Sequence, residues 1–143
     1  MDFNNLKDLY SDISKKREII LETLGEVASD VLDETIEKVV YDGDFQPNFY
    51  ERRYKNKGYG DRENINTEII SPGIIQITNE TLANGDEKGE RLDSIIEYGE
   101  SYGWNRQPDE RPVFDITKQK LNQSGILEKV VKKELNLLGF ETE

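Results

Sequence analysis

One long stretch of one-sided apolar spacing, residues 12–40, constrains the fold of this chain more than any other feature. Apolar residues recur there at intervals of three and four, which is typical of an amphipathic helix. Ser11 or Asp12 is a suitable N-cap, and Gly25 weakens the helix by about 1 kcal/mol relative to alanine. The helix is predicted to end near Tyr41. The apolar positions are Ile20, Leu24, Val27 and Val31 on one line, and Ala28, Leu32, Thr35 and Val39 beside it.

Isoleucine-rich runs in the middle of the chain predict strands. Isoleucines flank Pro72-Gly73, and this pair at the centre of a turn is the signature of type II, so a hairpin is expected over residues 67–79. A third strand is predicted at Leu92–Tyr98, where it stops at Gly99.

Helical spacing returns near the C-terminus. Asp115 is a suitable cap for a short helix to about Asn122, and Ser124 for a second one, which Gly139 would end in a left-handed conformation. The apolar stripe of the second helix is Leu127, Val130, Val131, Leu135 and Leu138.

These elements predict an α+β fold, in which a long N-terminal helix and a C-terminal helix pack on a small antiparallel sheet. The length of 143 residues fits a single domain over residues 1–143. We expect residues 1–11 to be a flexible N-terminus. Residues 41–66 are expected to form an extended loop that becomes ordered on assembly.

The expected loop is rich in aromatic and basic residues. In isolation such a run resembles a patch that stacks bases and meets phosphates. The chain, however, has a net charge of −11, and residues 61–100 hold ten acids and three bases. These charges favour contact of the loop with an acidic face of a neighbouring copy over nucleic-acid binding. The expected interface residues of this run are Tyr50, Arg52, Arg53, Tyr54, Lys55, Lys57 and Tyr59.

The sequence contains no cysteine and no histidine. Disulfides and thiolate metal sites are thereby excluded, and the commonest general base is missing. The paired acids, such as Asp42 and Asp44, lack the ligand pattern of a calcium loop. We therefore expect that the protein is not an enzyme and that it binds no cofactor and no metal ion. A carboxylate-based enzyme stays open as an alternative, and it would need a pocket with two carboxylates of perturbed pKa.

No apolar segment of the chain is long enough for a signal peptide or a membrane span, so folding in the cytoplasm is expected. The dense acids of residues 61–100 leave a further alternative open. The chain would then be an acidic adaptor, such as an inhibitor that mimics DNA and binds a basic protein.

Two segments in a fixed order resemble a known family. The first is a long helix followed by Tyr50-Glu51-Arg52-Arg53-Tyr54 and a hairpin. The second is Ile95-Ile96-Glu97-Tyr98-Gly99, followed by Arg111-Pro112-Val113-Phe114 and a helix. This arrangement resembles the head–tail connector and tail-completion (neck) proteins of tailed bacteriophages.

The resemblance implies a small α+β subunit of the virion that assembles as a ring, often a hexamer, between the head-side connector and the tail tube. DNA would pass through the central channel without specific binding, and an acidic wall would repel it. Localisation in the neck or tail of the virion is implied, after assembly in the bacterial cytoplasm. Glu97, Tyr98, Arg111 and Phe114 are expected at the subunit interface, with Arg111 placed to pair with Glu97.

Overall fold

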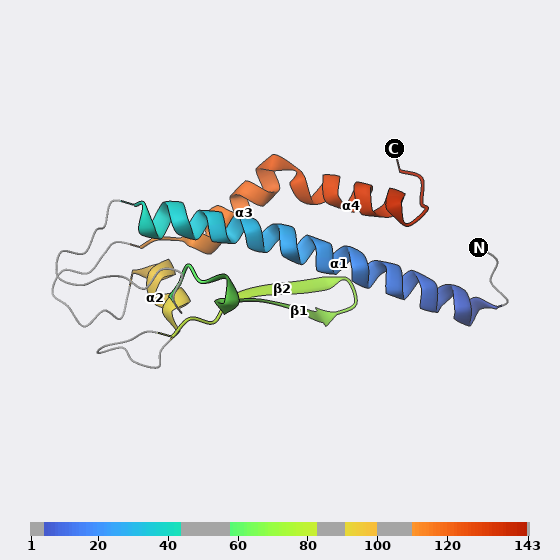
Figure 1. Ribbon diagram of the computed structural model, residues 1–143, viewed down its shortest axis with the longest axis horizontal. Coiled ribbons are helices and arrows are strands. Elements are labelled where there is room, and N and C mark those ends of the chain that lie inside the picture. Colours follow the sequence, from blue (N-terminus) through green and yellow to red (C-terminus); the bar gives the residue numbers. More distant parts are fainter. Residues whose placement is uncertain (1–4, 44–57, 83–90, 100–109, 143) are drawn as a thin grey trace.

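A computed structural model describes residues 5–43, 58–82, 91–99 and 110–142 of the chain (Figure 1). The α+β class is confirmed, because a long N-terminal helix and C-terminal helices accompany a two-stranded antiparallel sheet. In chain order the elements are α1 (Leu6–Ile36), a π-helical extension (Glu37–Tyr41), a 3-10 turn (Arg62–Asn64), β1 (Ile65–Ser71), β2 (Ile74–Asn79), α2 (Leu92–Tyr98), α3 (Val113–Ser124) and α4 (Ile126–Leu137).

Helix α1 begins at Leu6, so the start predicted at Ser11 or Asp12 is wrong. The side chain of Asn5 caps the helix, because its Oδ1 accepts a hydrogen bond from the N–H of Asp8 at 3.0 Å. Asp12 instead lies inside the helix and pairs with Lys16 one turn later, at 2.9 Å between Nζ and Oδ2. Residues 6–11 are therefore helical, whereas the sequence predicts a flexible segment there. The predicted end near Tyr41 is confirmed.

The hairpin predicted around Pro72-Gly73 is confirmed. Strands β1 and β2 pair antiparallel, with Thr67 opposite Ile77 and Ile69 opposite Ile75. Gly73 has a φ of 85°, a left-handed conformation that the second central position of a type II turn requires.

The hairpin packs directly on α1 at Gly25. A Cβ added at this glycine would lie 2.5 Å from Cδ1 of Ile75 and 3.4 Å from Cγ2 of Thr67. The glycine that costs helix propensity therefore allows the close approach of the two elements. Because side chains alternate along a strand, the residues next to Ile75 and Thr67 point away from α1.

The third predicted strand is wrong, because Leu92–Tyr98 forms helix α2. A short apolar run fits a buried strand and a buried helix equally well. As a helix, the segment places Ile96 in the core beside Val113. Just before α2, Leu82 and Arg91 form an isolated β-bridge.

The two C-terminal helices are confirmed, and Gly125 separates them. Helix α3 begins at Val113, earlier than the predicted Asp115. Ser124 assists the start of α4, because its hydroxyl oxygen accepts a hydrogen bond from the N–H of Ile126 at 3.3 Å. Beyond α4, the ring of Phe140 lies 5.0 Å from Nζ of Lys16, so the end of the chain contacts α1.

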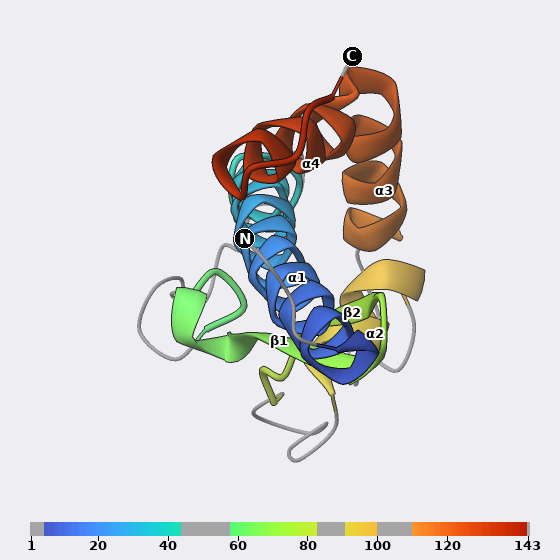
Figure 2. The ribbon, with the colours of Figure 1, turned by 90° about the vertical axis from the view of Figure 1, so that its right-hand side faces the viewer.

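The elements form three layers, with the hairpin on one side of α1 and α4 on the other (Figures 1 and 2). The hydrophobic core gathers at the C-terminal half of α1, and the first turns of the helix are largely exposed. Leu6 is 84% exposed and Tyr10 is 70% exposed. The buried core residues are Leu32, Ile36, Val40, Tyr59, Ile65, Ile96 and Val113.

Candidate assembly surfaces

Most of the predicted aromatic-basic interface lies outside the described residues. This holds for Tyr50, Arg52, Arg53, Tyr54, Lys55 and Lys57.

Tyr59, the last residue of that run, belongs to the hydrophobic core of the chain. It is 1% exposed and contacts the buried cluster around α1. Burial, and next the carboxylates of Asp93 and Glu97, raise the pKa of its phenol far above the ordinary value. The phenol oxygen has no hydrogen-bond partner among the described residues. Tyr59 is thus a core residue of the chain and not part of an open surface.

A buried polar network holds the Tyr59 segment against the end of β2. Nδ2 of Asn79 donates a hydrogen bond to the carbonyl oxygen of Tyr59 at 2.9 Å, and Nη2 of Arg91 donates to the carbonyl oxygen of Asn79 at 2.7 Å. Asn79 and Thr81 are fully or almost fully buried. The sequence does not predict this network; its signal there is a pair of polar residues, Asn79 and Thr81, at the end of a predicted strand.

The structure brings Glu97, Arg111 and Phe114 together at one corner. The carboxylate of Glu97 accepts hydrogen bonds from the N–H groups of Phe114 at 2.9 Å and Asp115 at 3.2 Å. It thereby caps α3, whose own N-cap residue, Pro112, offers no side-chain acceptor. The N–H of Arg111 donates to the carbonyl oxygen of Ile96 at 2.9 Å.

This corner is built within one chain, by the carboxylate of Glu97 and by backbone groups of the two segments. Asp115 receives a cap and does not supply one, so its predicted role as the cap is wrong. Phe114 is half-buried against the core, whereas Tyr98 on α2 is 64% exposed. Of the four expected interface residues here, only Tyr98 presents most of its side chain to solvent.

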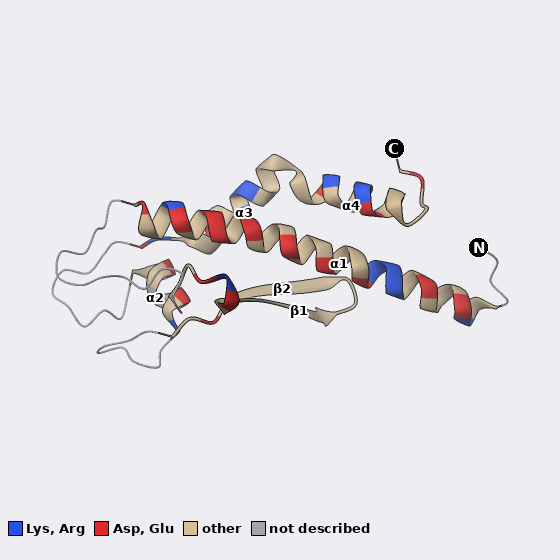
Figure 3. Cartoon of the chain, viewed as in Figure 1, with Lys and Arg blue, Asp and Glu red and all other residues tan. Residues whose placement is uncertain are grey.

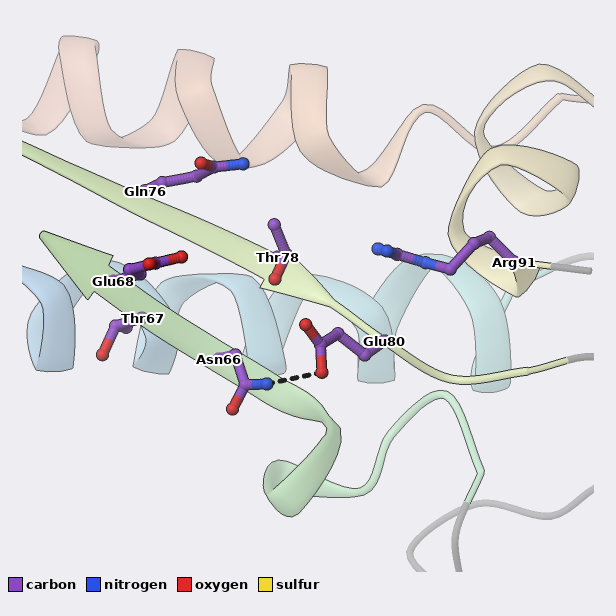
Figure 4. A pocket seen from close by; sticks show the side chains of 7 residues that line it. All are labelled: Asn66, Thr67, Glu68, Gln76, Thr78, Glu80 and Arg91. Carbon is purple, nitrogen blue, oxygen red and sulfur yellow. Dashed lines mark hydrogen bonds between the residues drawn. The ribbon is translucent and has the colours of Figure 1, made fainter. Parts of the chain in front are cut away.

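The outer face of the hairpin carries a shallow polar groove of about 460 Å³ (Figure 4). Glu68 and Glu80 contribute two carboxylates, and Oε2 of Glu80 accepts a hydrogen bond from Nδ2 of Asn66 at 2.6 Å. Arg91 lies at one end, where its Nη2 is 2.8 Å from Oδ2 of Asp93. No pattern in the sequence predicts this surface. Its lining residues are Asn66, Thr67, Glu68, Gln76, Thr78, Glu80 and Arg91.

The outward face of α4 is basic. Lys129, Lys132 and Lys133 are exposed, whereas the apolar stripe of this helix is half-buried against α1. Lys132 pairs with Glu128 one turn earlier, at 3.1 Å. Lys129 and Lys133 form no salt bridge within the described residues.

The described parts of the chain contain no group of three carboxylates that could hold a metal ion. None of their helices is sufficiently long and apolar to cross a membrane.

The comparisons with known proteins identify a family. No curated protein and no solved structure shows significant similarity to the chain. The family model of YomN matches residues 5–137, which is most of the 143-residue chain. This family is phage-related, from the region of the Bacillus phage SPBeta. The chain therefore belongs to the phage-related YomN family.

Proposed function

We propose that this protein is a structural component of a tailed-phage particle. It forms a homo-oligomeric ring, with six subunits as the expected number, that joins the head-side connector to the tail tube. It acts by assembly and not by catalysis, and it needs no cofactor and no membrane. It resides in the neck or tail of the virion after assembly in the host cytoplasm.

The corner around Glu97 is the observation that carries this proposal. The order of Glu97-Tyr98-Gly99 and Arg111-Pro112-Val113-Phe114 resembles neck proteins, and in this chain the two segments form one structural unit. That unit fixes α3 against α2, so it sets the direction in which the C-terminal helices leave the core. Membership of a phage-related family supports the virion context.

The acidic line along α1 is consistent with a channel through which DNA slides. Glu22, Glu26 and Asp30 are exposed at successive helical turns (Figure 3). Asp30 is partly neutralised by Arg62, at 3.4 Å between Oδ1 and Nη2. Carboxylates on a channel wall repel phosphate groups and reduce adhesion of passing DNA.

Electron microscopy of phage particles made without this protein tests the proposal. We expect filled heads and separate tails to accumulate, and a plasmid copy of the gene to restore joined particles. Particles that join normally without the protein would overturn the proposal.

The acidic line on α1 also favours one alternative, an adaptor that mimics DNA and binds a basic protein. Residues at i and i+4 have Cβ atoms about 5–6 Å apart on one face of a helix, so their carboxylates can form a row of negative charge. Purification of tagged protein from infected cells separates the two functions. The ring proposal expects virion proteins as partners, whereas the adaptor expects a basic nuclease or repressor.

A further inference from the structure

The described layers carry opposite charge on opposite sides of α1. Residues 58–82, which include the hairpin, contain four carboxylates and one arginine. Helices α3 and α4 contain five lysines and three carboxylates over residues 113–137. Figure 1 places the hairpin and α4 on opposite sides of α1, and the end-on view of Figure 2 agrees.

The acidic face is the outer surface of the hairpin. Thr67 and Ile75 point toward Gly25, so Glu68 and its cross-strand neighbour Gln76 point away from α1. Glu68 and Glu80 are exposed on this face, and the groove gives it a shallow concave shape.

The basic face is the outward surface of α4. Lys129 and Lys133 are four residues apart and therefore neighbours on one side of the helix. A helix presents a convex ridge of side chains, and a polar groove can accept such a ridge.

Exposed apolar residues lie at matching ends of the two faces. Ile70 and Ile74 beside the hairpin turn are each 53% exposed, and Leu137 at the end of α4 is 70% exposed. The turn and the end of α4 both point toward the end of the molecule where α1 begins (Figure 1). Parallel copies would therefore bring these apolar residues together while the charges meet beside them.

From these features we infer that the outer face of the hairpin of one copy docks on the outward face of α4 of the next copy. A two-fold dimer cannot satisfy both faces, because they lie on opposite sides of the subunit. The contact is therefore heterologous, and it closes into a ring when the rotation per subunit permits. This inference rests on the proposed ring function and identifies the surfaces that build the ring.

Charge exchange between the two faces tests the contact. Variant K129E/K133E makes both faces acidic, and variant E68K/E80K makes both faces basic. The chain with all four substitutions exchanges the signs and restores complementarity. Variant K7E/K15E is a matched control, because it reverses the same number of exposed lysines on the uncovered end of α1.

Native mass spectrometry and sedimentation measure assembly, and circular dichroism checks that each variant is folded. We expect the wild-type chain and K7E/K15E to form the same oligomer. Each single-face variant should assemble about tenfold more weakly or worse, because attractive pairs become repulsive. The chain with all four substitutions should recover assembly.

Three results would overturn the contact. The first is wild-type behaviour of both single-face variants, and the second is a folded fourfold variant that fails to assemble. In either case the wild-type oligomer persists, so the ring function stands and only the surfaces are wrong. The third result is a wild-type chain that stays monomeric at the highest soluble concentration. Separate heads and tails in particles without the protein would still support the proposed function in that case.

Discussion

The carboxylate of Glu97 stabilises a helix that begins well after it in the chain, by capping α3 at Phe114 and Asp115. Replacing Glu97 with alanine leaves these N–H groups without the acceptor, and we expect a loss of about 1 kcal/mol in the free energy of unfolding. The variant Glu97→Gln keeps an acceptor oxygen, so it should lose less. Urea unfolding measures both, with Glu110→Ala as an exposed control. Equal stability of the Glu97→Ala chain and the control would refute the capping role.

The buried phenol of Tyr59 predicts an alkaline limit to stability. Its pKa is raised in the folded chain from an ordinary value of 10.0, so the unfolded state loses its proton first. The neutral phenol therefore contributes fully to the free energy of unfolding below pH 10, and this contribution is lost as the pH rises above 10. Tyr59→Phe removes this titration and the hydroxyl that has no described partner.

We expect the Tyr59→Phe chain to be at least as stable as the wild type at about pH 8, and more stable above about pH 10, where the unfolded phenol ionises. Urea midpoints at both values measure the difference. Tyr98→Phe is the control, because it removes the same hydroxyl from an exposed position. A lower midpoint for Tyr59→Phe at both pH values would mean that the hydroxyl has a stabilising partner.

At the scale of elements, the sequence predicts those helices and turns whose formation depends on hydrophobic periodicity and turn residues. Helix α1, the hairpin around Pro72-Gly73 and the C-terminal helices all follow from local spacing. Helix α2 does not, because its Ile95-Ile96 pair fits either element and only the packing of Ile96 beside Val113 decides.

The candidate surfaces depend still more on contacts between distant segments. The sequence motif indicates that Glu97 and the start of α3 lie close together. The hydrogen bonds from the N–H groups of α3 to the Glu97 carboxylate, however, depend on how the chain folds between them. The groove on the hairpin and the lysines on α4 become opposite faces only when both elements pack on α1. No local pattern in the sequence predicts that the two surfaces lie on opposite sides of α1.

The packing of β2 on α1 at Gly25 leads to a prediction about two elements. Gly25→Ala gains about 1 kcal/mol of helix propensity but must displace Cδ1 of Ile75, which lies 2.5 Å from the new Cβ. We expect the two effects nearly to cancel. Ile75→Val removes Cδ1, so in that background Gly25→Ala should stabilise the chain by about 1 kcal/mol. Urea unfolding of the wild type, the two single variants and the double variant gives the coupling energy between positions 25 and 75. If Gly25→Ala changed the free energy of unfolding equally in both backgrounds, the close approach of the two residues would be contradicted.

For the whole molecule, the separation of charge between layers predicts that assembly weakens as salt increases. Exposed charges interact over a Debye length of about 10 Å at 0.1 M salt and about 3 Å at 1 M. If α4 of one copy meets the hairpin of the next, salt screens an attraction, and the dissociation constant should rise between these concentrations. If like-charged faces met instead, salt would screen a repulsion arising from the net charge of −11, and assembly would strengthen. Sedimentation across the salt series therefore gives the sign directly, and tighter assembly at about 1 M salt would exclude contact between the two oppositely charged faces.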